Sequence, residues 1–117
     1  MSIEKLIEKV LTESKTVKDI AKELATPDWD MKEKVWVKGD VLEIADTYWA
    51  GGERALDSLV DAWTKPNGTY ASYFHKEYGI TFELVNKDKQ MRAEGKYKKL
   101  SGSGTQLGIV IIFVKIK

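Results

Sequence analysis

The chain contains one histidine, His75, so any acid–base chemistry that uses an imidazole has to use this residue. Tyrosine and tryptophan side chains are concentrated in the middle of the sequence, and such residues line ligand pockets as well as hydrophobic cores. One hypothesis is therefore a small-ligand-binding protein, or an enzyme, with an aromatic pocket. The candidate residues for this pocket are Trp49, Trp63, Tyr73 and His75.

Metal and cofactor chemistry have no recognisable pattern in the sequence. The chain has no cysteine, and one histidine with scattered carboxylates gives no spacing typical of metal ligands. The glycine-containing stretch at 101–104 lacks the lysine of a phosphate-binding loop. We therefore predict no metal site and no cofactor.

Basic side chains gather in the last part of the chain. Residues 86–117 hold eight Lys or Arg against two Asp or Glu, whereas residues 1–85 hold eleven against sixteen. This asymmetry is typical of a protein with an anionic partner, and it gives a second hypothesis, a nucleic-acid-binding regulator. Lysines that protect an exposed sheet edge give the same pattern. The candidate nucleic-acid contacts are Arg92, Lys96, Lys98 and Lys99.

Length and composition bound the class of protein. The 117 residues, 43% hydrophobic and 32% charged, are typical of a folded globular chain, and we expect residues 1–117 to form a single domain.

The N-terminal residues show no basic stretch followed by an apolar run, so no signal peptide is predicted. No apolar run approaches the roughly 20 residues of a membrane span. We therefore expect a cytoplasmic protein with no membrane partner.

These candidate residues must be positioned by helices and strands that the hydrophobic periodicity predicts. Apolar residues recur at helical spacing over 3–11 and again over 17–24, where Thr16 is the expected N-cap. The motif at 26–28, Thr-Pro-Asp, is typical of a helix start and predicts a third helix that ends near residue 33. Residues 34–38 fit either a helix or a short strand.

Two more helices are predicted in the middle of the chain. Apolar residues keep one helical register over 40–63, and Gly51 and Gly52 predict a kink or a break within it. Residues 69–78 fit a strand or a helix, and Gly79 at the expected C′ position favours the helix.

From Ile80 the apolar residues alternate, which predicts a half-buried strand, a polar turn at 86–89 and a second strand over 91–98. The last stretch, residues 106–117, has no polar face between Ile109 and Val114, so it predicts a strand buried on both faces. The side chains expected to face the helices are Ile80, Phe82, Leu84, Met91, Ala93 and Tyr97.

Together these patterns predict an α+β fold in which four or five N-terminal and central helices pack on a C-terminal antiparallel meander of about three strands. In a meander the last strand lies at the edge, where one of its apolar faces lacks cover. Residues 35–37, a strand order that places this strand in the middle, or a second copy would supply the cover. We favour the second copy, and so predict a non-enzymatic binding or assembly module that self-associates through its C-terminal sheet as a homo-oligomer.

Overall fold

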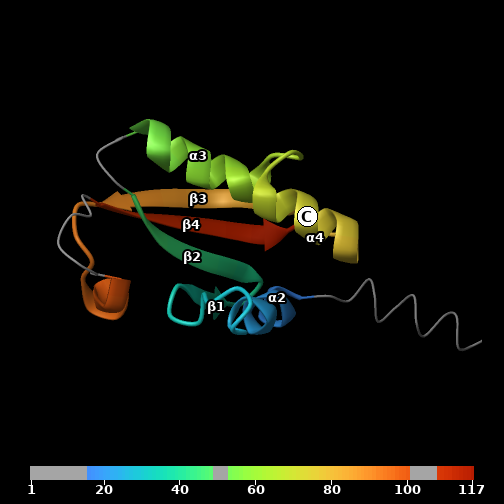
Figure 1. The fold of residues 1–117 in the computed structure, drawn as a ribbon, viewed down its shortest axis with the longest axis horizontal. Helices are drawn as coiled ribbons and strands as arrows, with labels where there is room; N and C mark the ends of the chain where they lie inside the picture. The colour runs from blue at the N-terminus through green and yellow to red at the C-terminus, as the bar shows by residue number, and fades with distance from the viewer. Residues whose placement is uncertain (1–15, 49–52, 101–107) are drawn as a thin grey trace, which may run out of the picture.

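The computed structural model describes residues 16–48, 53–100 and 108–117, which form an α+β fold (Figure 1). Three helices and a 3-10 helix surround one four-stranded antiparallel sheet in this part of the chain. The helices are α2 (Val17–Leu24), α3 (Glu53–Thr64), α4 (Thr69–Tyr78) and the 3-10 helix η1 (Gly95–Leu100). The strands are β1 (Val35–Lys38), β2 (Val41–Tyr48), β3 (Phe82–Gln90) and β4 (Gly108–Ile116).

The predicted α+β class is confirmed, but its arrangement differs from the prediction. The described residues form three α-helices rather than four or five, and the sheet takes strands from the middle as well as the end of the chain. The helix predicted over residues 3–11 lies outside the described residues. Residues 27–33, where a third helix was expected, form turns and no helix.

The terminal strand β4 lies in the interior of the sheet, not at its edge. The strand order is β1-β2-β4-β3, so β4 pairs with β2 on one side and with β3 on the other. Residues 109–112 and Val114 are at most 2% exposed, which confirms the predicted burial on both faces. The predicted meander order was wrong, because β2 inserts beside β4.

Strand β2 replaces the first half of the helix predicted over 40–63. A two-residue loop, Gly39-Asp40, joins β1 to β2, and Lys38 pairs with Val41 across it. Gly39 has a φ of 63°, and a positive φ at the first loop residue is what a type II′ hairpin turn requires. Both faces of β2 are covered, so its apolar residues do not alternate with polar ones and they mimic a helical pattern. The second half of the prediction is confirmed by α3.

One face of the sheet packs against all three helices. In Figure 1, α3 and α4 run along β3 and β4 while α2 lies beside β1. Each fully buried aliphatic or aromatic side chain in such a core stabilises the fold by about 1.5–3 kcal/mol. The most deeply buried residues of this core are Ile20, Leu24, Leu42, Ile44, Trp63, Phe74, Val110, Ile112 and Val114.

The 3-10 helix η1 covers the other face of the sheet. Tyr97 and Leu100 are three residues apart, so they share one side of a 3-10 helix and pack over Ile109 and Ile111 of β4. The predicted turn at 86–89 and strand over 91–98 were therefore wrong, because β3 continues to Gln90 and the chain then folds back as η1.

The expected helix-facing side chains divide between the two faces. Ile80 and Phe82 are buried in the helix-side core, as predicted. Ala93 and Tyr97 instead pack on the opposite face, with η1. Leu84 lies opposite Val114 and so on the helix-covered face, but it is 38% exposed, and Met91 is 74% exposed. The prediction was therefore wrong for Met91, Ala93 and Tyr97.

Gly68 fixes the corner between α3 and α4, because its backbone touches the end of α3. A Cβ atom at this position would lie 2.4 Å from the carbonyl oxygen of Asp61. We predict that Gly68→Ala lowers the free energy of unfolding by about 1–3 kcal/mol, since α4 would have to move away from α3. The measurement is urea denaturation, with Asn67→Ala, an exposed neighbour in the same turn, as the control. Equal stability of the two variants would contradict the prediction.

Candidate functional site

The corner between α3 and α4 holds two helices above the beginning of β3. The backbone N–H of Gly68 donates to the carbonyl oxygen of Lys65 at 2.8 Å, which closes the turn after α3. At the other end of α4, Gly79 takes a φ of 68°, and its N–H bonds back to His75. This left-handed C-cap, predicted from the sequence, turns the chain from α4 into β3.

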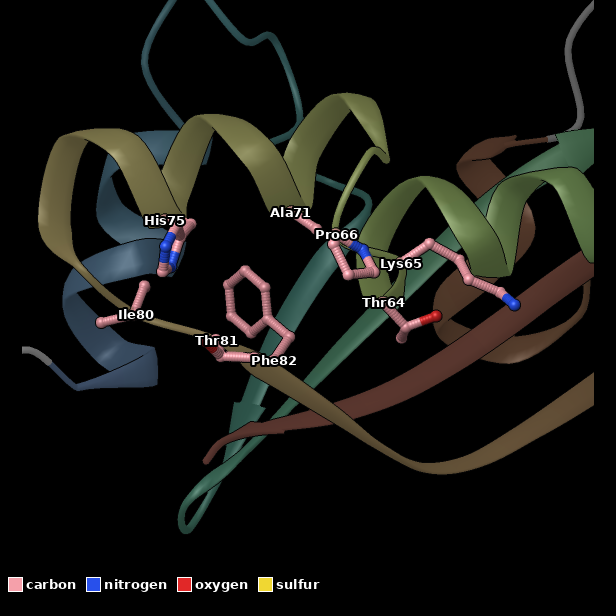
Figure 2. Close-up of a pocket in the computed structure, with 8 residues that line it drawn as sticks. All are labelled: Thr64, Lys65, Pro66, Ala71, His75, Ile80, Thr81 and Phe82. Carbon is pink, nitrogen blue, oxygen red and sulfur yellow. The ribbon is translucent and has the colours of Figure 1, made fainter.

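A pocket of about 190 Å³ opens between this corner, α4 and the first residues of β3. Figure 2 shows the ring of Phe82 between β3 and α4, with His75 on one side and Pro66 on the other. Phe82 and Ile80 are buried beneath the pocket, whereas His75 lies at its exposed rim. The complete lining is Thr64, Lys65, Pro66, Ala71, His75, Ile80, Thr81 and Phe82.

The pocket suits one apolar group of moderate size. An engineered apolar cavity of about 150 Å³ binds benzene, which sets the scale for the 190 Å³ found here. Pockets for drug-sized ligands are larger, about 300–1,000 Å³. In Figure 2 the side chain of Lys65 extends away from His75, so its amine and the imidazole do not converge on one point. The geometry therefore favours an apolar side chain over a larger charged ligand.

The outer edge of β3 lies beside this pocket. The N–H of Lys117 donates to the carbonyl oxygen of Thr81 at 2.8 Å, and hydrogen-bonded positions alternate in an antiparallel pair. Thr81 and Glu83 therefore direct their backbone groups toward β4, and Phe82 and Leu84 direct theirs outward. In the described part of the chain β4 is the only strand paired with β3.

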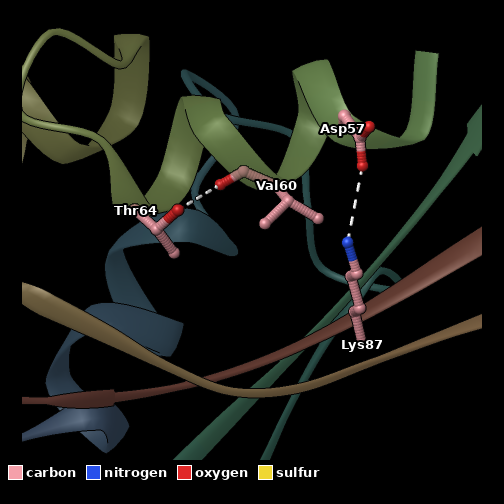
Figure 3. Close-up of polar contacts among 4 residues, drawn as sticks. All are labelled: Asp57, Val60, Thr64 and Lys87. Carbon is pink, nitrogen blue, oxygen red and sulfur yellow. Dashed lines mark hydrogen bonds and ion pairs between the residues drawn. The ribbon is translucent and has the colours of Figure 1, made fainter. Parts of the chain in front are cut away.

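A β-bulge at Val85 divides β3 into two arms. The pairing with β4 shifts by one residue between Leu84 and Asn86. The alternation between backbone groups directed toward β4 and those directed outward therefore also shifts by one residue after the bulge. Beyond it, Lys87 and Lys89 direct their backbone groups outward. Consistent with this one-residue shift, the side chain of Lys87 is on the helix-covered face, and its Nζ lies 3.4 Å from the Asp57 carboxylate of α3 (Figure 3).

Exposed apolar side chains follow the same edge. Leu84 and Val85 are 38% and 51% exposed, and Met91, just after β3, is 74% exposed. Three of the four exposed large hydrophobic residues in the described part of the chain are thus on or next to β3. Exposed apolar groups beside an unpaired strand edge are typical of a site of association.

The residues of the predicted aromatic pocket do not all lie around this cavity. His75 lines it, whereas Trp63 is buried in the core, stacked on Tyr70 with ring centroids 4.2 Å apart. Tyr73 is two residues from His75 and so lies on a different side of α4, against Trp29. Trp49 lies outside the described residues.

Tyr73 and Tyr78 instead hold α4 against α2. The hydroxyl of Tyr78 donates to Glu23 Oε1 at 2.5 Å, and that of Tyr73 lies 3.4 Å from the same oxygen. The hydrogen bond to Glu23 raises the pKa of Tyr78 well above its usual value, because the carboxylate favours the protonated phenol. This cluster is structural and lies apart from the pocket.

Two of the four predicted nucleic-acid contacts are bound to the protein's own carboxylates. Lys96 Nζ lies 2.8 Å from Glu43 and 4.9 Å from the centroid of the Trp36 ring. Lys99 Nζ lies 2.8 Å from Glu33.

The remaining two candidates, Arg92 and Lys98, are exposed. A lysine that is already paired contributes less to a phosphate-binding surface, so the arrangement reduces the basic footprint expected there.

Glu43 is a buried carboxylate that the sequence analysis missed. It is 5% exposed on β2, and its oxygens accept hydrogen bonds from Lys96 and from the hydroxyl of Tyr97 at 2.5 Å. A buried charge requires such partners, so the pair fixes η1 on the sheet. The available signal was a single acidic residue within an apolar stretch that turned out to be a strand.

Among the described residues, no group of three or more acidic or histidine side chains is arranged to hold a metal ion. None of the helices described is long and apolar enough to cross a membrane.

Comparison with protein-family models, with curated proteins and with solved structures finds no match to the chain.

The contact between Tyr97 and Glu43 makes a pH-dependent prediction. Burial and the Glu43 hydrogen bond raise the pKa of Tyr97 above its value of about 10 in the unfolded chain. A folded-state pKa raised in this way gives stability that is present below pH 10 and lost as the pH rises further. We predict that Tyr97→Phe is less stable than wild type by about 1.5–3 kcal/mol at pH 7, the range for a hydrogen bond to a charged group.

The measurement is denaturant unfolding of wild type and Tyr97→Phe at pH values from 7 to 11. The difference in unfolding free energy between them should stay constant up to about pH 10 and then shrink. A difference that stays constant to pH 11, or grows, would show that the phenol–carboxylate contact is not formed.

Proposed function

We propose that this protein is a polypeptide-binding module that accepts an extended segment of another chain along the outer edge of β3. The observation that carries the proposal is the position of the apolar pocket directly beside the outward-facing backbone of Phe82 and Leu84, with which no strand among the described residues pairs. In strand addition, main-chain hydrogen bonds supply affinity and a neighbouring pocket selects a side chain. Both parts of such a site are present around Phe82.

The geometry of a sheet decides which side chain would enter the pocket. Residues directly opposite each other on paired strands project from the same face. Phe82 lines the pocket, so a residue opposite Phe82 would project onto the helix-covered face at the pocket's mouth. The bound segment would thus present one apolar side chain to the pocket and its backbone to Phe82 and Leu84.

The expected affinity is modest. Each backbone hydrogen bond contributes about 0.5–1.5 kcal/mol net, and one buried apolar side chain contributes about 1.5–3 kcal/mol. The loss of translational and rotational freedom opposes these gains. We therefore expect a transient complex with a dissociation constant in the micromolar range or weaker, as is typical of small interfaces.

The other sequence-based hypotheses have less support from the geometry. Self-association was predicted because the last strand of a meander lacks cover on one face, but η1 and the helices cover both faces of β4. It stays a prediction that sizing by light scattering can test. Of the small-ligand candidates that the structure describes, only His75 lines the pocket, and the size of the pocket favours an amino-acid side chain over a larger ligand.

The proposal is tested by selecting binders from a displayed library of random seven-residue peptides. Peptides that bind should change the amide chemical shifts of Phe82 and Leu84 most strongly, because these groups would form the new hydrogen bonds. We predict that Ala71→Phe, which fills the pocket, weakens the selected peptides at least tenfold. The matched control is Ser72→Phe, which adds the same bulk at the next, exposed position of α4.

Two results would contradict the proposal. One is a library that yields no binder from a selection sensitive to millimolar dissociation constants. The other is a set of binders whose shift changes map away from β3 and whose affinities are equal in Ala71→Phe and Ser72→Phe.

A further inference from the structure

The charged residues of β3 restrict what can pair with its outer edge. The first arm of the strand, residues 82–84, has Glu83 between its two outward-facing residues. The second arm, residues 87–89, has Asp88 between two lysines. Residues directly opposite each other on neighbouring strands lie about 4.5–5.5 Å apart at their Cβ atoms, and like charges in such pairs are destabilising.

A second copy of the chain could place either of its two arms antiparallel to either arm of β3. Each of these pairings brings residues of like charge opposite each other. If the first arm pairs with the first arm of the copy, Glu83 lies opposite its own counterpart. If the second arm pairs with the second, Asp88 lies opposite its own counterpart and Lys87 lies opposite Lys89. If the first arm pairs with the second, Glu83 lies opposite Asp88.

Glu83 is placed where this repulsion would be felt. It is about half exposed, and Lys115 Nζ is 3.8 Å away on β4, on the side opposite to the outer edge of β3. Lys87 is directed toward Asp57 of α3, on the helix-covered face, and so does not neutralise Glu83 (Figure 3). A strand that pairs with residues 82–84 would therefore have one of its own residues directly opposite the Glu83 carboxylate.

We infer that the edge of β3 excludes a second copy of this chain and accepts a different polypeptide whose segment reads apolar–basic–apolar. The inference rests on the proposed function and specifies its partner. The first apolar residue lies opposite Phe82 and occupies the pocket, the basic residue lies opposite Glu83, and the second apolar residue lies opposite Leu84. Charge on the edge thus serves both to reject copies and to select the partner.

The partner sequence is tested with two synthetic peptides, capped at both ends, that differ only at their centre. One is Ser-Thr-Val-Lys-Val-Thr-Ser and the other has Glu in place of Lys. The Lys peptide should bind about threefold to tenfold more tightly at low salt, and this preference should shrink as salt rises. In Glu83→Thr the preference should disappear, whereas in Glu94→Thr, which removes an exposed carboxylate away from the strand, it should remain.

The exclusion of copies is tested with the same variants and no peptide. The amide chemical shifts of Phe82 and Leu84 should not change on dilution of wild type or Glu94→Thr from millimolar concentration. In Glu83→Thr they should change, because a threonine pair replaces the two opposed carboxylates and permits pairing.

The failures of the two proposals are distinguishable. Concentration-dependent shifts at Phe82 and Leu84 in wild type would overturn the exclusion of copies and leave strand addition itself intact. Equal binding of the Lys and Glu peptides at β3 would overturn only the inferred apolar–basic–apolar sequence of the partner. Selected library peptides that all bind away from β3 would overturn the proposed function and this inference together.

Discussion

The structure depends on one constraint, the burial of a strand that has no polar face. From Ile109 to Ile112 and again at Val114, β4 is almost completely hidden from solvent. Such a strand needs a layer over each face and a neighbour on each edge, since unpaired buried backbone groups are costly. The helices cover one face, η1 covers the other, and β2 and β3 pair with its two edges.

This arrangement moves the exposed edges to β1 and β3. Strand β1 is four residues long, and α2 packs beside it. Strand β3 is nine residues long, and in the described part of the chain its outer side has no paired strand. Bulges and charged side chains are features that limit pairing at the edge strands of natural proteins, and β3 has both, at Val85 and at its charged residues. In the proposed function, the pocket beside Phe82 gives this edge a place where a specific segment binds.

The sequence predicted those elements whose signals are local. The capping box of Thr16 and Asp19 begins α2, Gly79 ends α4, and the β-branched run of β4 forms a strand, all as expected. It did not predict β2, because a strand covered on both faces has no alternation and its apolar residues also fit a helix. The hairpin signal at Gly39-Asp40 was present, and it was read as the start of a helix.

The site was predictable only at His75. Its other lining residues come from α3, the following turn, α4 and the residues that lead into β3, and their meeting depends on the corner at Gly68 rather than on spacing in the sequence. The basic cluster was visible as composition, but its partners are distant. Lys96 contacts Glu43 and Lys99 contacts Glu33, more than fifty residues away, so local patterns could not show that these charges are already paired.

Amide hydrogen exchange of the free protein, measured by NMR, reports both on the interior position of β4 and on the outer edge of β3, with which no described strand pairs. We expect slow exchange at every residue from Ile109 to Lys115, because β4 bonds alternately to β2 and β3. Along β3 we expect alternation, with slow exchange at Glu83 and fast exchange at Phe82 and Leu84. Alternating protection along β4, or uniform protection along β3, would show that this strand arrangement is wrong.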